Sequence, residues 1–290
     1  MTEIIDKKYN LIFSFLRLIY RLFKKFLKPS KKKIIIVKKF NCSFFVYLNE
    51  DLGFRLKYLP GTHEDKEIYF IEKFFSYILK NKKKVFFVDI GANFGLYSIY
   101  LGKKYSNSLI HAFEPNKEAS FLLKKNKIYN KLDNIKIHET ALSYKTGFTS
   151  FQNSNNESTY NYIQQNINNK INKIKVNTLD NFLKENKTSI DIVKIDVEGA
   201  EYQVLLGALK MLNNKKNKPR LIMVELVDEM LKRFKTSKKK VLNFMNKLKY
   251  DCYIIDKKKI IPYTSQLYEQ NYFFIDNKID IKKINLKNIE

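Results

Sequence analysis

The chain has 290 residues, of which 44% are hydrophobic, and a formal net charge of +26, so it can form one domain of about 200–250 residues with extensions. Its basic residues are fifty lysines and five arginines, and because arginine makes the bidentate contacts with phosphates and bases, this excess argues against specific nucleic-acid recognition. Two distant cysteines and three histidines without ligand spacing argue against a disulfide framework and a zinc site, and they suit a cytoplasmic protein.

Residues 1–30 are predicted to form an amphipathic basic helix and a short linker. Between residues 7 and 28 the polar side chains fall within a helical sector of about 100°, and apolar side chains occupy the rest. Arg17 and Arg21 interrupt the apolar run, so this segment is not expected to span a bilayer, and no small-residue cleavage site follows it. We expect it to lie on an anionic surface at the inner membrane face, or else to dock on the body of the protein or in a dimer contact.

Residues 31–82 form a predicted N-terminal extension. Apolar patterning predicts short strands over 34–37, 43–48 and 54–59, and residues 66–80 have the apolar spacing of a helix with one buried side. We expect this extension to pack against the main sheet and to cover part of its ligand-binding edge.

Residues 83–276 alternate between strand and helix patterns, which predicts an α/β fold. Such alternation implies a parallel sheet with helices on both faces and ligands at the carboxyl ends of the strands. Residues 152–173, rich in Asn and Gln, are expected to be a lid, a substrate loop or disordered filler, and residues 277–290 a frayed basic tail. The predicted strands are 85–89, 109–113, 134–139, 190–195, 220–225, 250–255 and 271–275, and the predicted helices are 95–104, 116–129, 178–186 and 199–212.

The most informative segment is residues 85–98, where an apolar run stops at Asp89, turns through Gly91 and Gly95 and then takes helical spacing. Glycines permit a positive φ and a close approach of a ligand, and the N–H groups of the following helix favour an anionic group. Dinucleotide sites carry a further glycine and an acid about 20 residues later. The carboxylate of Asp89 would repel a pyrophosphate, and it suits an ammonium or a sulfonium, both of which S-adenosylmethionine offers.

A second acid follows the next predicted strand. Glu114 ends the run that begins at Leu109 and can accept both hydroxyls of a ribose, and Pro115 stops the strand and starts the next helix. Either motif alone is weak, but the two together at this spacing predict a site for S-adenosylmethionine.

These motifs and four later ones resemble the FkbM family of S-adenosylmethionine-dependent methyltransferases. The matching segments occur in the family's order within residues 83–226, and residues 59–67 resemble the acidic stretch that precedes the domain in relatives. The resemblance implies a Rossmann-like class I methyltransferase sheet of seven strands, mostly parallel with the last antiparallel. It also implies methyl transfer, usually to a hydroxyl oxygen of a sugar or a polyketide-like small molecule. The segments are Val-Asp-Ile-Gly-Ala-Asn-Phe-Gly at 88–95, Ala-Phe-Glu-Pro-Asn at 112–116, Thr-Ala-Leu-Ser at 140–143, Thr-Leu-Asp at 178–180, Lys-Ile-Asp-Val-Glu-Gly-Ala-Glu at 194–201 and Leu-Ile-Met-Val-Glu at 221–225.

The predicted site lies at the carboxyl ends of the strands. Carboxylates bunched at one sheet edge repel one another, which raises their pKa values towards those of a general base. We expect Asp196 to be the base and Glu198 and Glu225 to shape or orient the acceptor site; a divalent cation bridging these acids and a sugar diol is an open alternative. Glu201 is expected to be a helix cap. The predicted cofactor-binding residues are Asp89, Gly91, Asn93, Gly95, Glu114, Pro115 and Ala141, the last through its backbone beside the adenine ring.

We therefore expect an O-methyltransferase acting on a sugar or glycan, such as a surface polysaccharide or a lipid-linked saccharide, with a small secondary metabolite as the alternative acceptor. A nucleic-acid methyltransferase is less favoured because the chain contains neither an Asn-Pro-Pro-aromatic turn nor a Pro-Cys nucleophile. An NAD enzyme is opposed by Asp89 and the missing glycine. A non-catalytic binding module is opposed by the acidic strand ends.

Overall fold

The computed structural model describes residues 27, 29, 31–59, 64–154, 157–164, 173–186, 189–256, 259–267 and 269–284. The amphipathic segment predicted over residues 7–28 lies outside the described residues, apart from Leu27. In the described part of the chain, no helix is both long enough and apolar enough to cross a membrane.

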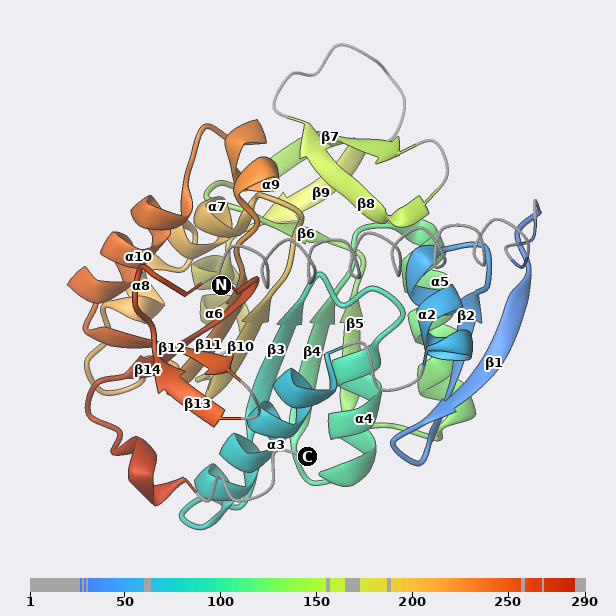
Figure 1. The fold of residues 1–290 in the computed structure, drawn as a ribbon. Coiled ribbons are helices and arrows are strands. Elements are labelled where there is room, and N and C mark those ends of the chain that lie inside the picture. Colours follow the sequence, from blue (N-terminus) through green and yellow to red (C-terminus); the bar gives the residue numbers. More distant parts are fainter. Residues whose placement is uncertain are drawn as a thin grey trace, which may run out of the picture.

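The centre of the described fold is an eight-stranded sheet (Figure 1). In spatial order its strands are β13 (Lys259–Pro262), β12 (Tyr250–Asp256), β14 (Asn271–Asp276), β11 (Leu221–Glu225), β10 (Ile192–Ile195), β3 (Phe86–Ile90), β4 (Leu109–Phe113) and β5 (Ile135–His138). From β11 to β5 all neighbours pair in parallel, and β14 is antiparallel to both β11 and β12. The predicted parallel sheet with an antiparallel last strand is therefore confirmed.

The prediction of seven strands is wrong by one. The additional strand, β13, pairs with β12 as an antiparallel hairpin, with Ile255 opposite Ile260. This hairpin lies at the edge of the sheet, where a short strand ending in Pro262 is tolerated because its free side needs no partner.

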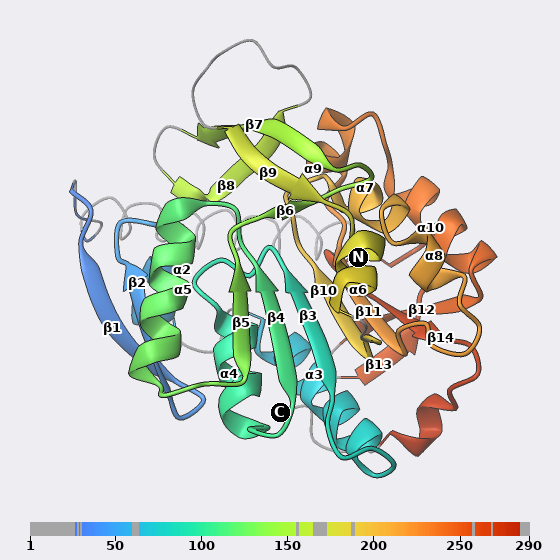
Figure 2. The ribbon, with the colours of Figure 1, turned by 180° about the vertical axis from the view of Figure 1, so that it is seen from behind.

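Helices cover both faces of the sheet, and each face has its own apolar core. Figure 1 shows two helices of the first face in front of the sheet, and Figure 2 shows α6 on the opposite side. The first face is covered by α3 (Asp65–Leu79), α4 (Leu96–Lys104) and α5 (Lys117–Tyr129), and the second by α6 (Leu179–Asn186), α7 (Glu201–Leu206), α8 (Leu209–Leu212), α9 (Asp228–Arg233) and α10 (Lys238–Lys247). The single helix predicted over 199–212 is thus two helices, α7 and α8, separated at Gly207 and Ala208.

The N-terminal extension contains a hairpin and two helices. Strands β1 (Ile34–Lys39) and β2 (Cys42–Tyr47) pair antiparallel, but the strand predicted over 54–59 is wrong because Asp51–Tyr58 forms helix α2. The helix brings Asp51 within 3.0 Å of Arg55, one turn later, and buries Phe54. An alternating pattern of three apolar residues was too short to distinguish the two structures.

The extension packs against the main sheet, as predicted. The ring of Phe70 on α3 meets Phe273 on β14 with 4.7 Å between centroids, and Phe75 meets Phe87 on β3 at 5.8 Å. All four rings are fully buried, and burying a side chain of this size contributes about 1.5–3 kcal/mol. The extension is therefore part of one core with the sheet rather than a separate unit.

A second, four-stranded sheet lies beyond the carboxyl ends of the parallel strands, at the top of Figures 1 and 2. Its strands, in spatial order, are β6 (Ala141–Leu142), β9 (Lys173–Asn177), β7 (Gly147–Ser154) and β8 (Glu157–Gln164). The described residues within 152–173 form most of the β7–β8 hairpin and are therefore not disordered filler. Their role as a lid or a substrate loop stays a prediction.

The last described residues correct the expectation of a frayed tail. A 3-10 helix spans Ile281–Lys283, and Ile284 is buried in the apolar core on the first face. The remaining residues, 285–290, lie outside the described part of the chain.

Candidate active site

The glycine turn follows β3, and its two glycines are required by contacts within the protein. Gly91 has a φ of 77°, and a Cβ there would lie 1.8 Å from the backbone oxygen of Asp196. Gly95 has a φ of 93°, and a Cβ there would lie 2.3 Å from a methyl carbon of Leu123 on α5. The space predicted for a ligand at these two Cβ positions is thus filled by the β10 loop and by α5. Both glycines bring elements of the site into close contact.

Asp89 is the single acid of β3, and it is fully buried instead of exposed to solvent at the sheet edge. Its Oδ2 accepts a hydrogen bond of 2.6 Å from the hydroxyl of Ser98 on α4. Among the described residues Oδ1 has no hydrogen-bond partner, and it lies 3.7 Å from Nζ of Lys194. Burial raises the pKa of Asp89, and the charge of Lys194 opposes this.

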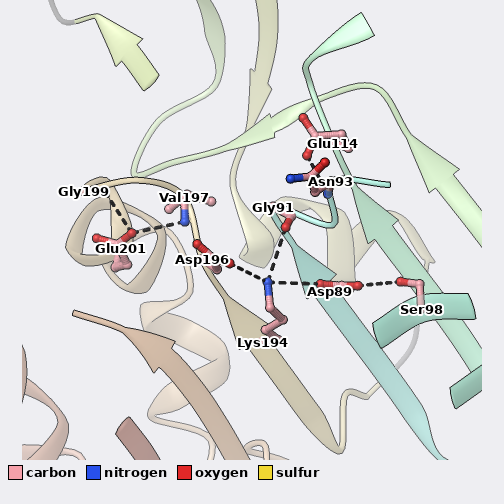
Figure 3. A network of polar contacts seen from close by, with 10 residues as sticks. All are labelled: Asp89, Gly91, Asn93, Ser98, Glu114, Lys194, Asp196, Val197, Gly199 and Glu201. Atoms are coloured by element: carbon pink, nitrogen blue, oxygen red, sulfur yellow. Dashed lines mark hydrogen bonds and ion pairs between the residues drawn. The ribbon is translucent and has the colours of Figure 1, made fainter. Parts of the chain in front are cut away.

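Lys194 of β10 is the central cation of the site (Figure 3), and sequence reasoning did not identify it. Its ammonium donates to Oδ2 of Asp196 at 3.0 Å and to the carbonyl of Gly91 at 3.4 Å, and it lies over the ring of Tyr97. Burial would lower the pKa of Lys194, but Asp196 and Asp89 outweigh burial and raise it. The available signal was a lysine within a central strand of otherwise apolar residues. Because an unpaired buried ammonium is very costly, such a lysine indicates acidic partners nearby.

The three predicted catalytic carboxyl groups are brought together at the ends of β10 and β11. Asp196 follows β10 and has a side chain that is 25% exposed. Burial, followed by the charges of Asp196 and Glu201, raises the pKa of Glu198 to about 8. Burial, followed by Asp196 and Glu198, raises the pKa of Glu225 well above its usual value. The predicted repulsion is present, but burial is the larger cause.

Two features suit these carboxyl groups to binding and proton transfer. Glu225 lies close enough to Asp196 for the charge of Asp196 to raise the pKa of Glu225, so the two groups are placed to exchange a proton. Within the described part of the protein, Oε2 of Glu198 is buried without a hydrogen-bond partner. Glu198 also has a φ of 57°, a strained conformation for a residue with a side chain that is often found at functional sites.

Glu114 joins two loops of the predicted cofactor site. Its Oε2 accepts from the backbone N–H of Asn93 and its Oε1 from that of Asn116, both at 2.8 Å. Burial raises the pKa of Glu114 to about 7, against the effect of these two hydrogen bonds. Each carboxylate oxygen can accept a second hydrogen bond. Glu114 can therefore still receive ribose hydroxyls while it holds the loops after β3 and β4 in place.

Two other predicted residues have clear positions. Pro115 precedes Asn116, whose side chain caps α5 by accepting from the N–H groups of Glu118 and Ala119. Ala141 is buried in strand β6, which pairs with β9. Its contact with an adenine ring remains a prediction.

Glu201 lies in the first turn of α7, as predicted, but its side chain bonds the preceding loop instead of capping the helix. Its Oε1 accepts from the backbone N–H groups of Val197 and Gly199, at 3.1 and 2.9 Å, so it holds the loop that carries Glu198. Burial raises the pKa of Glu201 to about 7.

Glu64 is a second residue that sequence reasoning did not assign to the site. It is the N-cap of α3, with a φ of 51°. After burial and nearer charges, Glu64 adds to the raised pKa values of Asp89 and Glu225. The extension therefore reaches the edge of the site. The sequence did not reveal this contact because Glu64 is far along the chain from β3, β10 and β11.

The arrangement suits a cationic sulfonium or ammonium ligand. Five acidic side chains, those of Glu64, Asp89, Asp196, Glu198 and Glu225, influence one another around a single lysine. The first turn of α4 offers backbone N–H groups for a carboxylate. In the part of the chain that the structure describes, no group of three or more His, Cys, Asp or Glu side chains has the arrangement of a metal site.

Comparison with known proteins gives matches over the same region. Residues 89–252, more than half of the chain, match the methyltransferase FkbM domain. Methyltransferase 1 of Beauveria bassiana (strain ARSEF 2860) is 26% identical over 185 residues, which cover 57% of this chain and 72% of that protein. Methyltransferase sdnD of Sordaria araneosa is 31% identical over 154 residues, which cover 42% of this chain and 60% of that protein, less than two thirds of its length.

Solved structures are matched at lower identity. The crystal structure of M. jannaschii TYW2 in complex with AdoMet covers 85% of this chain and 85% of its own, with 16% identity and a TM-score of 0.37. A likeness of this degree supports no inference about the acceptor or the site.

Proposed function

Since the chain belongs to the FkbM methyltransferase family, we propose that its acceptor is a hydroxyl group of a sugar or glycan. The chain is an S-adenosylmethionine-dependent methyltransferase, and this donor supplies a methyl group already activated on a positively charged sulfur. The protein therefore has three tasks: to hold the donor, to place the acceptor oxygen in line with it, and to receive the hydroxyl proton.

The residues of two turns, the glycine turn after β3 and the acidic turn after β4, would hold the donor. The backbone between Gly91 and Gly95 leads into the first turn of α4, which suits the methionine carboxylate. Glu114, fixed by Asn93 and Asn116, suits the ribose hydroxyls. Asp89 is buried below this turn, next to Lys194, and its carboxylate balances the charge of the lysine ammonium.

The acidic groups of β10 and β11 would receive the acceptor. Asp196 is partly exposed, so an acceptor hydroxyl can reach it, and we assign it the role of general base. Lys194 donates to Asp196 and holds it in one orientation, and Glu225, whose pKa is raised, lies beside it. Glu198, with a pKa of about 8, is suited to share the proton near neutral pH.

The observation that carries this proposal is the junction of Asp196, Glu198 and Glu225 at two neighbouring strand ends. Uncharged sugar hydroxyls have high pKa values, so their methylation requires a group that accepts the proton as the bond to carbon forms. Hydrogen-bonding carboxyl groups also match the several hydroxyls of a saccharide.

The test is a transfer assay with labelled S-adenosylmethionine and a panel of nucleotide sugars, lipid-linked saccharides, phenolic metabolites and RNA. Mass spectrometry of the product should locate the methyl group on a sugar oxygen, and an Asp196→Asn variant should form product about 10²–10⁴-fold more slowly while it still binds donor in isothermal titration. Methyl transfer to a phenolic metabolite or to RNA under the same conditions would refute the saccharide assignment. Absence of donor binding by the native chain would refute the site itself.

A further inference from the structure

We propose that one face of the folded protein binds the surface of an anionic lipid bilayer. This face, called here the basic apolar face, consists of Ile34 and Ile36 on β1, Phe121, Ile128 and Tyr129 on α5, and the lysines of residues 31–47 and 117–131. It lies at the β5 end of the main sheet, where β1, β2 and α5 are side by side in both ribbon views (Figures 1 and 2). The proposal is independent of the acceptor.

Apolar side chains of this face point into solvent. Ile128 is 75% exposed, Tyr129 54% and Phe121 52%, and Ile36 is 47% exposed. Phe121 and Ile128 are seven residues apart on α5, so they lie on one side of the helix, while Leu122 and Leu123 are buried on the other. A single exposed apolar residue is ordinary, but several on neighbouring elements mark an interaction surface.

Contacts make the hairpin and the helix one continuous surface. Ile36 lies directly opposite Phe45 in the β1–β2 ladder, so their side chains share a face. The ring of Phe45 meets Tyr129 of α5 edge to face, with 5.1 Å between centroids, and Lys125 places its ammonium 4.1 Å from the centre of the Phe45 ring. An ion pair between Lys32 and Glu118 further joins the two elements.

The charge of the face matches anionic headgroups. Residues 31–47 contain five lysines and no acid, and residues 117–131 contain five lysines and a single acid, Glu118. Ion pairs of Lys32 with Glu118, Lys39 with Asp65 and Lys124 with Glu139 offset part of this charge, and the remaining excess is positive. Each lysine near an anionic membrane contributes about 1 kcal/mol of attraction. Exposed apolar side chains surrounded by lysines are suited to a lipid interface, because the apolar groups enter the acyl boundary while the ammonium groups meet the phosphates.

Two other occupants fit this surface less well. In a symmetric contact with a second copy, the same face would meet itself, and the lysine clusters of both copies would repel each other. Nucleic acid would satisfy the lysines but leave Ile36, Phe121 and Ile128 without apolar partners. In sequence, the amphipathic segment of residues 7–28 ends just before Lys31, so a membrane contact by that segment and one by this face would support each other.

The experiment is flotation of the full chain with vesicles of phosphatidylcholine containing phosphatidylglycerol, compared with vesicles of phosphatidylcholine alone. We expect binding to the anionic vesicles only, with a loss at high salt. The Phe121→Gln/Ile128→Gln variant should bind about tenfold or more weakly. The matched control is Leu206→Gln/Leu209→Gln, because those leucines are 36% and 40% exposed on α7 and α8, on the opposite face; it should bind like the native chain.

Hydrogen exchange of the native chain provides a test that needs no variant. Anionic vesicles should protect backbone amides within residues 31–47 and 117–131 but leave α8 unchanged. Unaltered flotation of the Phe121→Gln/Ile128→Gln variant, or exchange unchanged by vesicles, would overturn the proposal. Failure of the native chain to bind anionic vesicles would equally overturn it. In that case, loss of a dimer in sedimentation by the variant would assign the face to a second copy, and loss of binding to random-sequence RNA would assign it to nucleic acid.

Discussion

Replacement of Lys194 by methionine should destabilise the fold strongly, because it removes the cation that lies between the buried Asp89 and Asp196. The ammonium lies 3.0 Å from Oδ2 of Asp196 and 3.7 Å from Oδ1 of Asp89. At an effective dielectric constant of about 20, Coulomb's law gives roughly 5 kcal/mol for each contact. The desolvation of the ammonium offsets part of this, so we expect a loss of about 3–5 kcal/mol in the free energy of unfolding, as for other buried pairs that lose one partner.

The loss should depend on pH with a definite sign. Burial already raises the pKa of Asp89 in the folded protein, and Lys194 opposes that rise. Without the ammonium the pKa of Asp89 rises further above its value in the unfolded chain. The folded variant then binds an additional proton at low pH, so the loss of stability should be smallest in acid and should grow as the pH rises through that higher pKa.

Urea unfolding followed by circular dichroism measures both effects. Lys218→Met is the matched control, since the side chain of Lys218 is only 6% exposed and lies 2.9 Å from Asp276, at the end of β11 that is remote from the site. It should lose comparable stability but retain the native affinity for S-adenosylmethionine in isothermal titration. A Lys194→Met variant that loses less than about 1 kcal/mol, or whose loss does not depend on pH, would refute this reasoning.

The remaining predictions concern the carboxyl groups. Glu114→Gln should weaken donor binding about 10–100-fold with little change in fold, because an amide can accept from only one of the two loop N–H groups that Glu114 now accepts; titration that matches the native chain would contradict the loop-holding role. Asp196→Asn should lower turnover about 10²–10⁴-fold while donor affinity is retained, and parallel losses of both would indicate a structural role instead. The rate should rise with pH through about 8, the pKa of Glu198, and Glu198→Gln should abolish this limb because it removes the group that titrates there; a limb that persists unchanged would exclude Glu198. Because Glu114 and Glu201 have pKa values of about 7 when folded, above their usual value of 4.5, the native fold should be more stable near pH 5 than near pH 8 in urea unfolding, and the opposite slope would contradict their burial.

The parallel core was predictable because its information is local. Apolar runs of strand length alternated with helical spacing, and each element's type follows from periods of about two or 3.6 residues. The same reasoning failed at residues 54–59, where three apolar positions fit either period, and α2 formed because Asp51 pairs with Arg55 and Phe54 is buried. It also missed β13, a short edge strand whose pattern is weak.

The site shows a similar division. Asp196 and Glu225 could be placed at one edge from chain order alone, because the carboxyl ends of neighbouring parallel strands coincide. Lys194 is recognisable as a lone lysine within an apolar strand, but its role is not written in that strand. Its role depends on Asp89 and Gly91, more than 100 residues earlier in the chain, which only the pairing of β3 with β10 brings beside it.

By itself, the amino-acid sequence determined the alternating fold, the family, and which acids stand at the strand ends, since each of these is written in short segments. Tertiary structure decided which of those acids are buried, which cation faces them, and what fills the space beside Gly91 and Gly95. The physical reason is that pKa values and charge pairing depend on distance and on exclusion of water, and both arise only when segments far apart in the chain are packed together.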